Sequence, residues 1–120
     1  MFISINHIPV TPGREADFEQ LFRQRERSVQ EQPGFISLDV LKPGAKMQMG
    51  KPIPDDSNEY QVLTRWQSAE AFRNWISSDS FKKSHSRESD PAIFAGKSYL
   101  STHETVEGAG SSLEIASSRT

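Results

Sequence analysis

Residues 60–76 read YQVLTRWQSAEAFRNWI and contain the change of period that decides the fold. Over residues 60–66, one set of side chains alternates with another, as in a strand with two different faces. The first set is Tyr60, Val62, Thr64 and Trp66, and the second is Gln61, Leu63 and Arg65. Ser68 can then cap a helix over residues 69–77, in which the apolar spacing becomes helical. The stretch predicts a strand followed directly by a helix.

The segments before this stretch predict a strand over residues 2–10, a helix over residues 15–32 and a second strand over residues 35–41. The helix carries an apolar stripe at helical spacing and ends at Pro33-Gly34. Its stripe consists of Phe18, Leu21, Phe22 and Val29. Residues 42–58 hold three prolines and two glycines, which predicts a long loop or an irregular hairpin arm.

The segments after it predict a further short helix capped by residues 78–80, a polar connection over residues 87–96 and a last strand over residues 97–106. In the short helix, Phe81 and His85 lie one turn apart on the same face. The predicted order is βαββαβ, which is a ferredoxin-like plait of the α+β class.

Length and composition favour one small domain over residues 1–106. Residues 107–120 read EGAGSSLEIASSRT, which predicts a disordered tail. The formal charge of −2 argues against nucleic acid as a partner, and no apolar run is long enough for a membrane span. With zero cysteines, disulfides, thiolate metal sites and cysteine nucleophiles are excluded. We expect a cytoplasmic protein.

A four-stranded sheet with both helices on one face leaves its other face bare. Leu38, Val40 and Leu63 are expected to meet water on that face. A symmetric homodimer whose two sheets pack face to face into a barrel would cover them.

No nucleophile elbow, phosphate loop, zinc-protease motif or dinucleotide fingerprint occurs. Four residues are nevertheless unusual. Asn6 places an amide in a strand, Arg25 interrupts the apolar stripe, Trp75 lies on the inner side of a short helix, and His85 follows it. Each has an ordinary interpretation: a backbone hydrogen bond for Asn6, snorkelling along the helix or an ion pair for Arg25, core packing for Trp75, and an exposed or capping position for His85.

Two further histidines, His7 and His103, become neighbours if the first and last strands pair. Such a pair can hold a metal ion, but cross-strand histidine pairs on a surface are ordinary.

A family resemblance is carried by Asn6, by the segment PGFISLDVLKP (33–43) and by the segment LTRWQSAEAFRNWISSDSFKKSH (63–85). With these features the sequence resembles the IsdG-type haem-degrading monooxygenases. These enzymes belong to the antibiotic biosynthesis monooxygenase superfamily of dimeric α+β barrels. The resemblance covers residues 1–106. The loop over residues 42–58 is longer than the resemblance leads us to expect, and the tail after Val106 is an addition to the family pattern.

The resemblance implies roles for five residues. Asn6 would lie on the distal side of the haem and donate a hydrogen bond to bound oxygen, Trp75 would press the porphyrin out of plane, and His85 would be the proximal iron ligand. Phe22 and Arg25 match pocket positions, with Arg25 placed to pair with a propionate. Haem would be cofactor and substrate, consumed with O₂ and electrons from an external reductant, and iron would be released.

Two other functions remain open. A cofactor-free oxygenase of the same superfamily would act on a polyketide or quinol and would need no proximal histidine. A non-catalytic dimer would bind haem without degrading it.

Overall fold

The computed structural model describes residues 1–24, 28–54, 57–84 and 90–110, without the side chains of residues 83 and 84. Its main sheet has the strand order β2-β5-β1-β6, and all neighbouring strands are antiparallel. A second, two-stranded sheet pairs β3 with β4. The elements are β1 (Phe2–Pro9), α1 (Glu15–Gln24), η1 (Ser28–Glu31), β2 (Phe35–Leu41), β3 (Lys46–Gln48), β4 (Lys51–Ile53), β5 (Glu59–Trp66), α2 (Ala69–Ile76), α3 (Asp79–Ser84), η2 (Pro91–Ile93) and β6 (Tyr99–Glu104).

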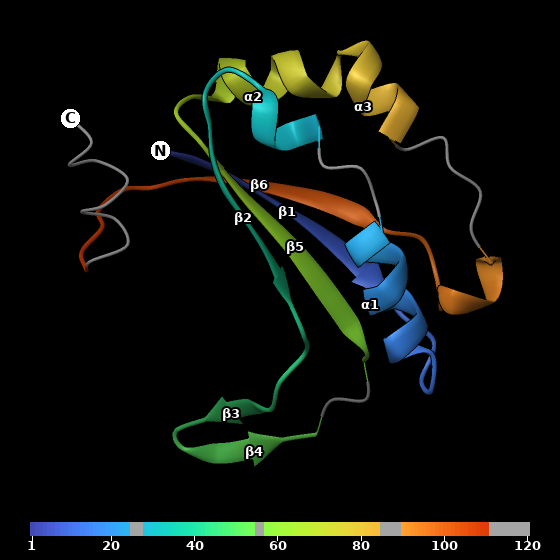
Figure 1. The fold of residues 1–120 in the computed structure, drawn as a ribbon. Coiled ribbons are helices and arrows are strands. Elements are labelled where there is room, and N and C mark those ends of the chain that lie inside the picture. Colours follow the sequence, from blue (N-terminus) through green and yellow to red (C-terminus); the bar gives the residue numbers. More distant parts are fainter. Residues whose placement is uncertain (25–27, 55–56, 85–89, 111–120) are drawn as a thin grey trace.

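The order and pairing confirm the ferredoxin-like plait of the α+β class. In Figure 1, α2 and α3 lie over the end of the sheet where β1 begins, and α1 lies near the end where β1 finishes. The predicted cap is present, because the Ser68 side chain accepts a hydrogen bond from the backbone N–H of Ala71 at the start of α2. Ser78 does the same for Phe81 in α3.

The alternation along β5 separates the two faces of the sheet. Tyr60, Val62, Thr64 and Trp66 are buried under the helices, while the residues between them are only half-buried. In the register of β1 against β5, Ser4 lies opposite Thr64 and Asn6 lies opposite Val62. Asn6 therefore belongs to the helix-facing side.

The helix-facing side carries two separate apolar clusters. The α1 cluster consists of Ile8, Val10, Phe18, Phe22, Tyr60, Val62 and Ile93. The α2 cluster consists of Val29, Trp66, Phe72 and Trp75. Leu38 is half-buried and packs against both clusters.

Buried polar groups in the sheet pair with one another. Ser4 Oγ and Thr64 Oγ1 lie 2.5 Å apart, and the indole N–H of Trp66 donates to the same Thr64 oxygen at 2.9 Å. The Tyr60 hydroxyl donates to Glu19 Oε2 at 2.6 Å, which fixes α1 to β5. Burial and this hydrogen bond raise the pKa of Tyr60.

The prediction of one helix over residues 15–32 was wrong. Helix α1 is described to Gln24, and residues 28–31 form a 3-10 turn. Val29 packs in the α2 cluster and not with Phe18 and Phe22. One straight helix cannot pack side chains into both clusters. The chain therefore turns before Val29, which packs in the same cluster as Phe72 and Trp75.

The polar connection predicted over residues 87–96 was also wrong in part. Within it, η2 buries Ile93 in the α1 cluster, and Phe94 packs against that cluster. The polar residues around this apolar pair hid it in the sequence. Residues 85–89 lie outside the described part.

Leu38 and Val40 were assigned to the wrong face. They lie opposite Thr64 and Val62, so they are on the helix-facing side. A register shift between Phe35 and Ser37 determines which face of the sheet these side chains occupy, and the strand sequence alone does not reveal it.

Leu63 does lie on the other side of the sheet, which we call the open face. Its apolar side chains include Ile3, Ile5, Leu41 and Leu63, and the rings of His7 and Tyr99 also lie on it.

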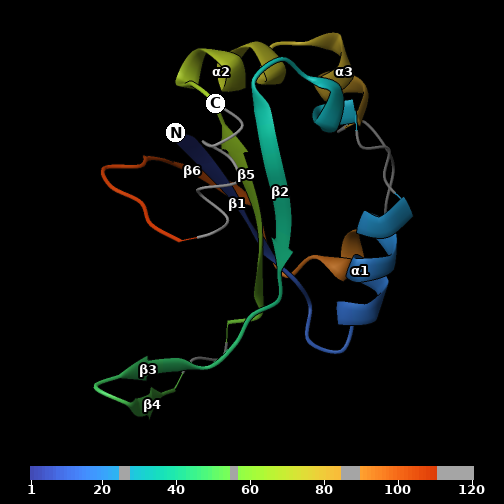
Figure 2. The same cartoon turned by 60° about the vertical axis from the view of Figure 1, so that its left-hand side comes forward.

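Residues 46–53 form a hairpin, which confirms the arm foreseen between β2 and β5. At its turn, Met49 and Gly50 both have positive φ angles, of 53° and 78°. Figure 2 shows the hairpin reaching away from the sheet on the side opposite α1.

Residues 107–110, the described part of the expected tail, form no helix or strand. Across the described ranges, no helix is long and apolar enough to cross a membrane.

Gly34 is required by both its backbone and its surroundings. Its φ is +84°, and a Cβ placed there would lie 2.5 Å from the Cβ of Ala71 in α2. Gly13 has a similar φ of +90° but nothing within 4 Å. We predict that Gly34→Ala destabilises the fold by about 3 kcal/mol and Gly13→Ala by about 1 kcal/mol, because only the first adds a collision to the strain. Urea unfolding measures both, and equal losses would contradict this account.

Candidate functional site

The Asn6 side chain occupies the helix-facing side of β1 between the two apolar clusters and belongs to neither. Its cross-strand neighbours are Val62 on β5 and Leu100 on β6. Asn6 is half-buried, and its carboxamide makes no hydrogen bond within the described residues. The ordinary interpretation, a bond to a neighbouring loop, is therefore not what the described part shows. The group is available to a ligand.

The sheet beside Asn6 is uncovered. On β6, Leu100 and Thr102 also face the helix side, and both are exposed; Leu100 keeps 48 % of its surface accessible. We call Asn6, Leu100 and Thr102 the open strip. It combines apolar surface with one unpaired amide, and the helices do not bury it. Neighbouring ribbons frame the strip in Figure 1, where α2 and α3 lie to one end and α1 to the other.

Trp75 projects from α2 and is buried, with 7 % of its surface accessible. Its ring meets that of Phe81 edge to face, with centroids 5.4 Å apart. The indole N–H makes no hydrogen bond to a described residue. Among the described, non-exposed residues, every fully buried polar side-chain atom has a hydrogen-bond partner. Because the indole N–H has none, it is not fully buried, and this edge of the ring reaches the surface. Trp75 is thus a core residue with one accessible edge.

Of the three other predicted site residues, only Phe22 lies within the described ranges. Phe22 lies in the α1 cluster, tilted against Phe18 at 6.2 Å, and not in the cluster that holds Trp75. Arg25 and His85 lie outside the described residues. The structure thus places Phe22 and Trp75 in the clusters on either side of Asn6.

The open face carries a hydrogen-bonded row, of which the sequence indicated only that His7 and His103 lie near each other when the first and last strands pair. His7 Nδ1 lies 3.1 Å from Glu59 Oε2, and His7 Nε2 lies 2.8 Å from Ser101 Oγ. Ser101 Oγ lies 3.1 Å from His103 Nε2. The Tyr99 ring stacks on His7 with centroids 4.3 Å apart. Only the pairing of β1 with β5 and β6 brings these residues together, so their spacing in the chain gives no signal.

This row is not arranged as a metal centre. The Ser101 hydroxyl stands between the two imidazoles and bonds to both. Within the described ranges, no group of three histidine or acidic side chains is placed to hold a metal ion. Since a carboxylate only accepts, His7 donates to Glu59 through Nδ1. His7 Nε2 is then left to pair with the Ser101 hydroxyl.

The row shifts the acidity of Glu59. Burial acts to raise the pKa of this carboxyl, but hydrogen bonds from His7, Tyr99 and Gln61 outweigh it and hold the pKa below its ordinary value. The Tyr99 hydroxyl donates at 3.1 Å, and its own pKa is raised by that bond. Folding therefore favours the ionised form of Glu59.

The comparisons with known proteins agree with this architecture. The family model for antibiotic biosynthesis monooxygenases matches residues 1–87. The chain belongs to the antibiotic biosynthesis monooxygenase family.

Two similar proteins are haem-degrading enzymes by name. A haem-degrading monooxygenase of Listeria welshimeri is 39 % identical over 64 residues, which are 53 % of this chain. This match spans only 47 % of the Listeria protein, about half of its length. A mycobilin-producing haem oxygenase of Mycobacterium tuberculosis is 26 % identical over 108 residues, covering 90 % of this chain and 92 % of the relative.

A solved structure is also similar. It is that of MhuD, the haem degrader of M. tuberculosis, with two haems bound in its active site. It superimposes with a TM-score of 0.68 at 25 % identity, over 92 % of this chain and all of the other.

The Glu59 carboxylate predicts a pH-dependent stability. Because its folded pKa is lowered, its contribution is present above the pKa of the unfolded chain and is lost as the pH falls through the folded value. We expect Glu59→Gln to cost about 1 kcal/mol at pH 7 and much less at an acidic pH at which the folded carboxyl is protonated. Urea unfolding at both pH values measures this. Glu31→Gln, at an exposed glutamate with no bond to a described residue, is the control and should cost little at either pH. A loss that persists unchanged in acid would contradict the assignment.

Proposed function

We propose that the protein is a haem-degrading monooxygenase, which opens the porphyrin ring with O₂ and reducing equivalents and releases iron. One observation carries the proposal: the unpaired Asn6 carboxamide lies on the open strip between two aromatic-rich clusters. The family membership and the activities of the two relatives support it.

The residues present fit a flat, mainly apolar macrocycle. A porphyrin needs apolar walls on its faces and polar contacts at its centre and its propionates. Leu100 supplies exposed apolar surface on the strip, and Phe22 and Trp75 lie in the clusters on either side of it. Asn6 is the amide between these clusters. We infer that haem binds over the strip.

His85 and Arg25 complete the proposed site. His85 directly follows α3 in the sequence, and imidazole is a common axial ligand of haem iron. Arg25 directly follows the last described residue of α1, and a guanidinium can pair with a propionate. Both assignments rest on the resemblance to the IsdG-type enzymes.

Bound haem supplies the iron at which O₂ is reduced, and its own ring is the substrate. The chain's residues then have three tasks. With haem bound over the strip, the Asn6 N–H would donate a hydrogen bond to oxygen on which negative charge develops. Trp75 would press against the porphyrin through its accessible edge and so orient the ring. The apolar clusters on either side would contact the apolar parts of the macrocycle.

We further propose that the enzyme is a cytoplasmic homodimer formed through the open faces and supplied with electrons by a separate donor. The half-buried apolar residues of the open face, Ile3, Ile5 and Leu63, are left without cover in a single chain. A sheet of this kind in a small domain is stabilised by a second copy.

Adding hemin to the purified protein, and then ascorbate in air, tests the function. We expect a Soret band of bound haem that disappears as iron is released. A cofactor-free oxygenase acting on a polyketide or quinol would not bind hemin. A non-catalytic haem-binding dimer would keep the Soret band after the reductant is added. Either result contradicts the proposal.

Asn6→Ala should bind haem normally and degrade it about 10²-fold more slowly, because a preorganised donor is lost while the resting site is intact. The fold should be unaffected, since the carboxamide bonds to no described residue. The rate of Soret loss measures the effect. Asn74→Ala, at an exposed position of α2, is the control and should degrade haem at the wild-type rate. Near-normal turnover of Asn6→Ala would remove Asn6 from the mechanism.

Trp75→Phe separates packing from catalysis. Phe retains most of the buried area, so we expect nearly full thermal stability and haem binding but slower turnover, because the smaller ring presses less on the porphyrin. Trp75→Ala should cost about 3–5 kcal/mol of stability. Thermal unfolding and the rate of Soret loss are measured on the same preparation. If Trp75→Phe degrades haem at the wild-type rate, Trp75 acts only in packing.

His85→Ala should fold and lose the ferric haem spectrum of an imidazole-ligated iron. His103→Ala is the matched control, because His103 is exposed and lies on the open face. It should retain that spectrum. Visible absorption after hemin addition compares the two, and a wild-type spectrum from His85→Ala would exclude His85 as the proximal ligand.

A further inference from the structure

The β3–β4 hairpin and its linking residues form an arm, residues 42–54, that leaves the sheet between β2 and β5. Its strands pair with each other and with no strand of the main sheet. The arm reaches out on the side opposite α1, which is the side of the open face (Figure 2). A two-stranded hairpin is at best marginally stable in water by itself, so an arm of this kind is expected to rest on a surface.

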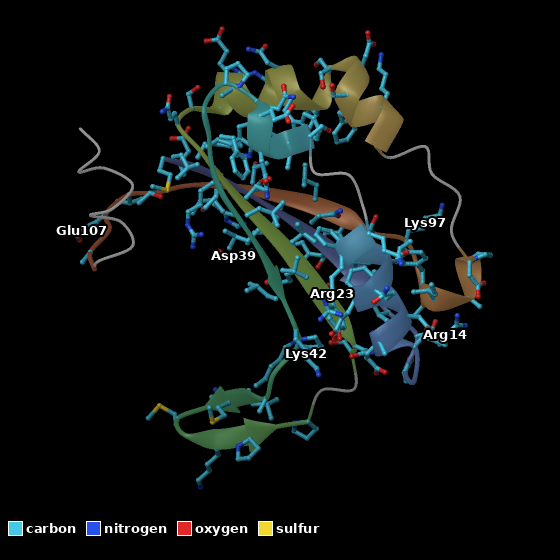
Figure 3. The ribbon with its side chains drawn as sticks, viewed as in Figure 1. Arg14, Arg23, Asp39, Lys42, Lys97 and Glu107 are labelled. Carbon is cyan, nitrogen blue, oxygen red and sulfur yellow. The ribbon has the colours of Figure 1, made fainter. Side chains whose placement is uncertain are left out.

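The side chains of the arm are apolar and basic. Met47, Met49 and Ile53 keep 65 %, 94 % and 40 % of their surfaces accessible. Methionine adapts well to an irregular apolar partner surface. Lys42, at the base of the arm in Figure 3, is one of three lysines in residues 42–54, which contain no acidic residue. The surface that receives the arm should therefore be apolar and acidic.

The rest of the same chain has the complementary charge. The whole chain carries −2 and the arm carries +3, so the remaining residues carry −5. The open face is also polarised. Glu59 and the exposed ring of Tyr99 lie at the end nearest the arm, whereas His103 and Arg65, which is paired with Asp39, lie towards the other end.

The geometry of a two-fold pair connects these features. If two open faces pack with the axis along the strands, the β2 edge of each sheet lies over the β6 edge of the other, and equivalent strand ends meet. The arm, which continues from β2, then reaches the Glu59 and Tyr99 end of the second copy. An axis across the strands would instead bring its lysines to the Arg65 end, where the Asp39 carboxylate is already paired with the Arg65 guanidinium at 2.9 Å.

We propose that the arm of each copy packs against the Glu59 and Tyr99 end of the open face of a second copy, as a clasp across the dimer. This inference rests on the proposed homodimer. Met47, Met49 and Ile53 then lose their exposure to water, and the lysines face a carboxylate. The arm contributes to dimer affinity and not to the fold of the single chain.

Cross-linking between chains tests the contact directly, because the chain contains no native cysteine. Met49→Cys in an affinity-tagged chain is co-produced with Tyr99→Cys in an untagged chain, and a short bis-maleimide is added. We expect a product of intermediate mass that holds one chain of each kind. Val106→Cys replaces Tyr99→Cys in the control, since Val106 is fully exposed but follows the far end of β6. Equal cross-linking to both positions, or none to Tyr99→Cys, would overturn the proposal.

A variant with residues 45–54 replaced by Gly-Ser-Gly-Ser tests the energetics. Light scattering across a dilution series should show a dimer for the wild type and at least a tenfold weaker dimer for the variant. A variant of unchanged affinity overturns the clasp and leaves the dimer standing. A monomeric wild type overturns both. Haem degradation is measured separately with hemin and ascorbate, so failure of the proposed function is distinguishable from failure of the clasp.

Discussion

The register of β1 against β5 is the constraint on which the rest of the structure depends. Side chains alternate along a strand, so a slip of one residue would move Asn6 to the open face and His7 under the helices. Buried polar contacts oppose that slip. Ser4 and Thr64 face each other at 2.5 Å, and Trp66 bonds to the same hydroxyl. Breaking these contacts would leave buried hydroxyls unpaired, at a cost of about 1–3 kcal/mol each.

Once the register is set, the two helical layers explain why one strip of sheet stays uncovered. Helix α1 and η2 bury the end of the sheet around Ile8, and α2 with η1 buries the end around Trp66. Asn6 lies between them, and no helix in the described part covers Leu100 on β6. Two small cores instead of one continuous core leave room for a flat ligand. The polar row from Glu59 to His103 occupies the opposite face and is separate from this site.

The local patterns in the sequence predicted most of the fold. The alternation over residues 60–66, the cap at Ser68 and the order of elements were confirmed. The errors concerned long-range information. Val29 matched the stripe of the first helix but packs beneath α2, and Val40 changed face because of a register shift in β2. For the site, the sequence identified the amide of Asn6 but not the Glu59–His7–Ser101 row, whose members are brought together only by strand pairing.

The central claim is that a porphyrin binds over the open strip at Asn6. The chain has three asparagines, so selective ¹⁵N labelling gives three resolvable side-chain amide pairs. Gallium protoporphyrin, a diamagnetic analogue of haem, is titrated while these pairs are followed by NMR. The Asn6 pair should shift and saturate at one equivalent. The Asn58 pair, held by Val10 and Glu15 at the far end of β1, should not move. Porphyrin binding that leaves the Asn6 pair unchanged would contradict the account.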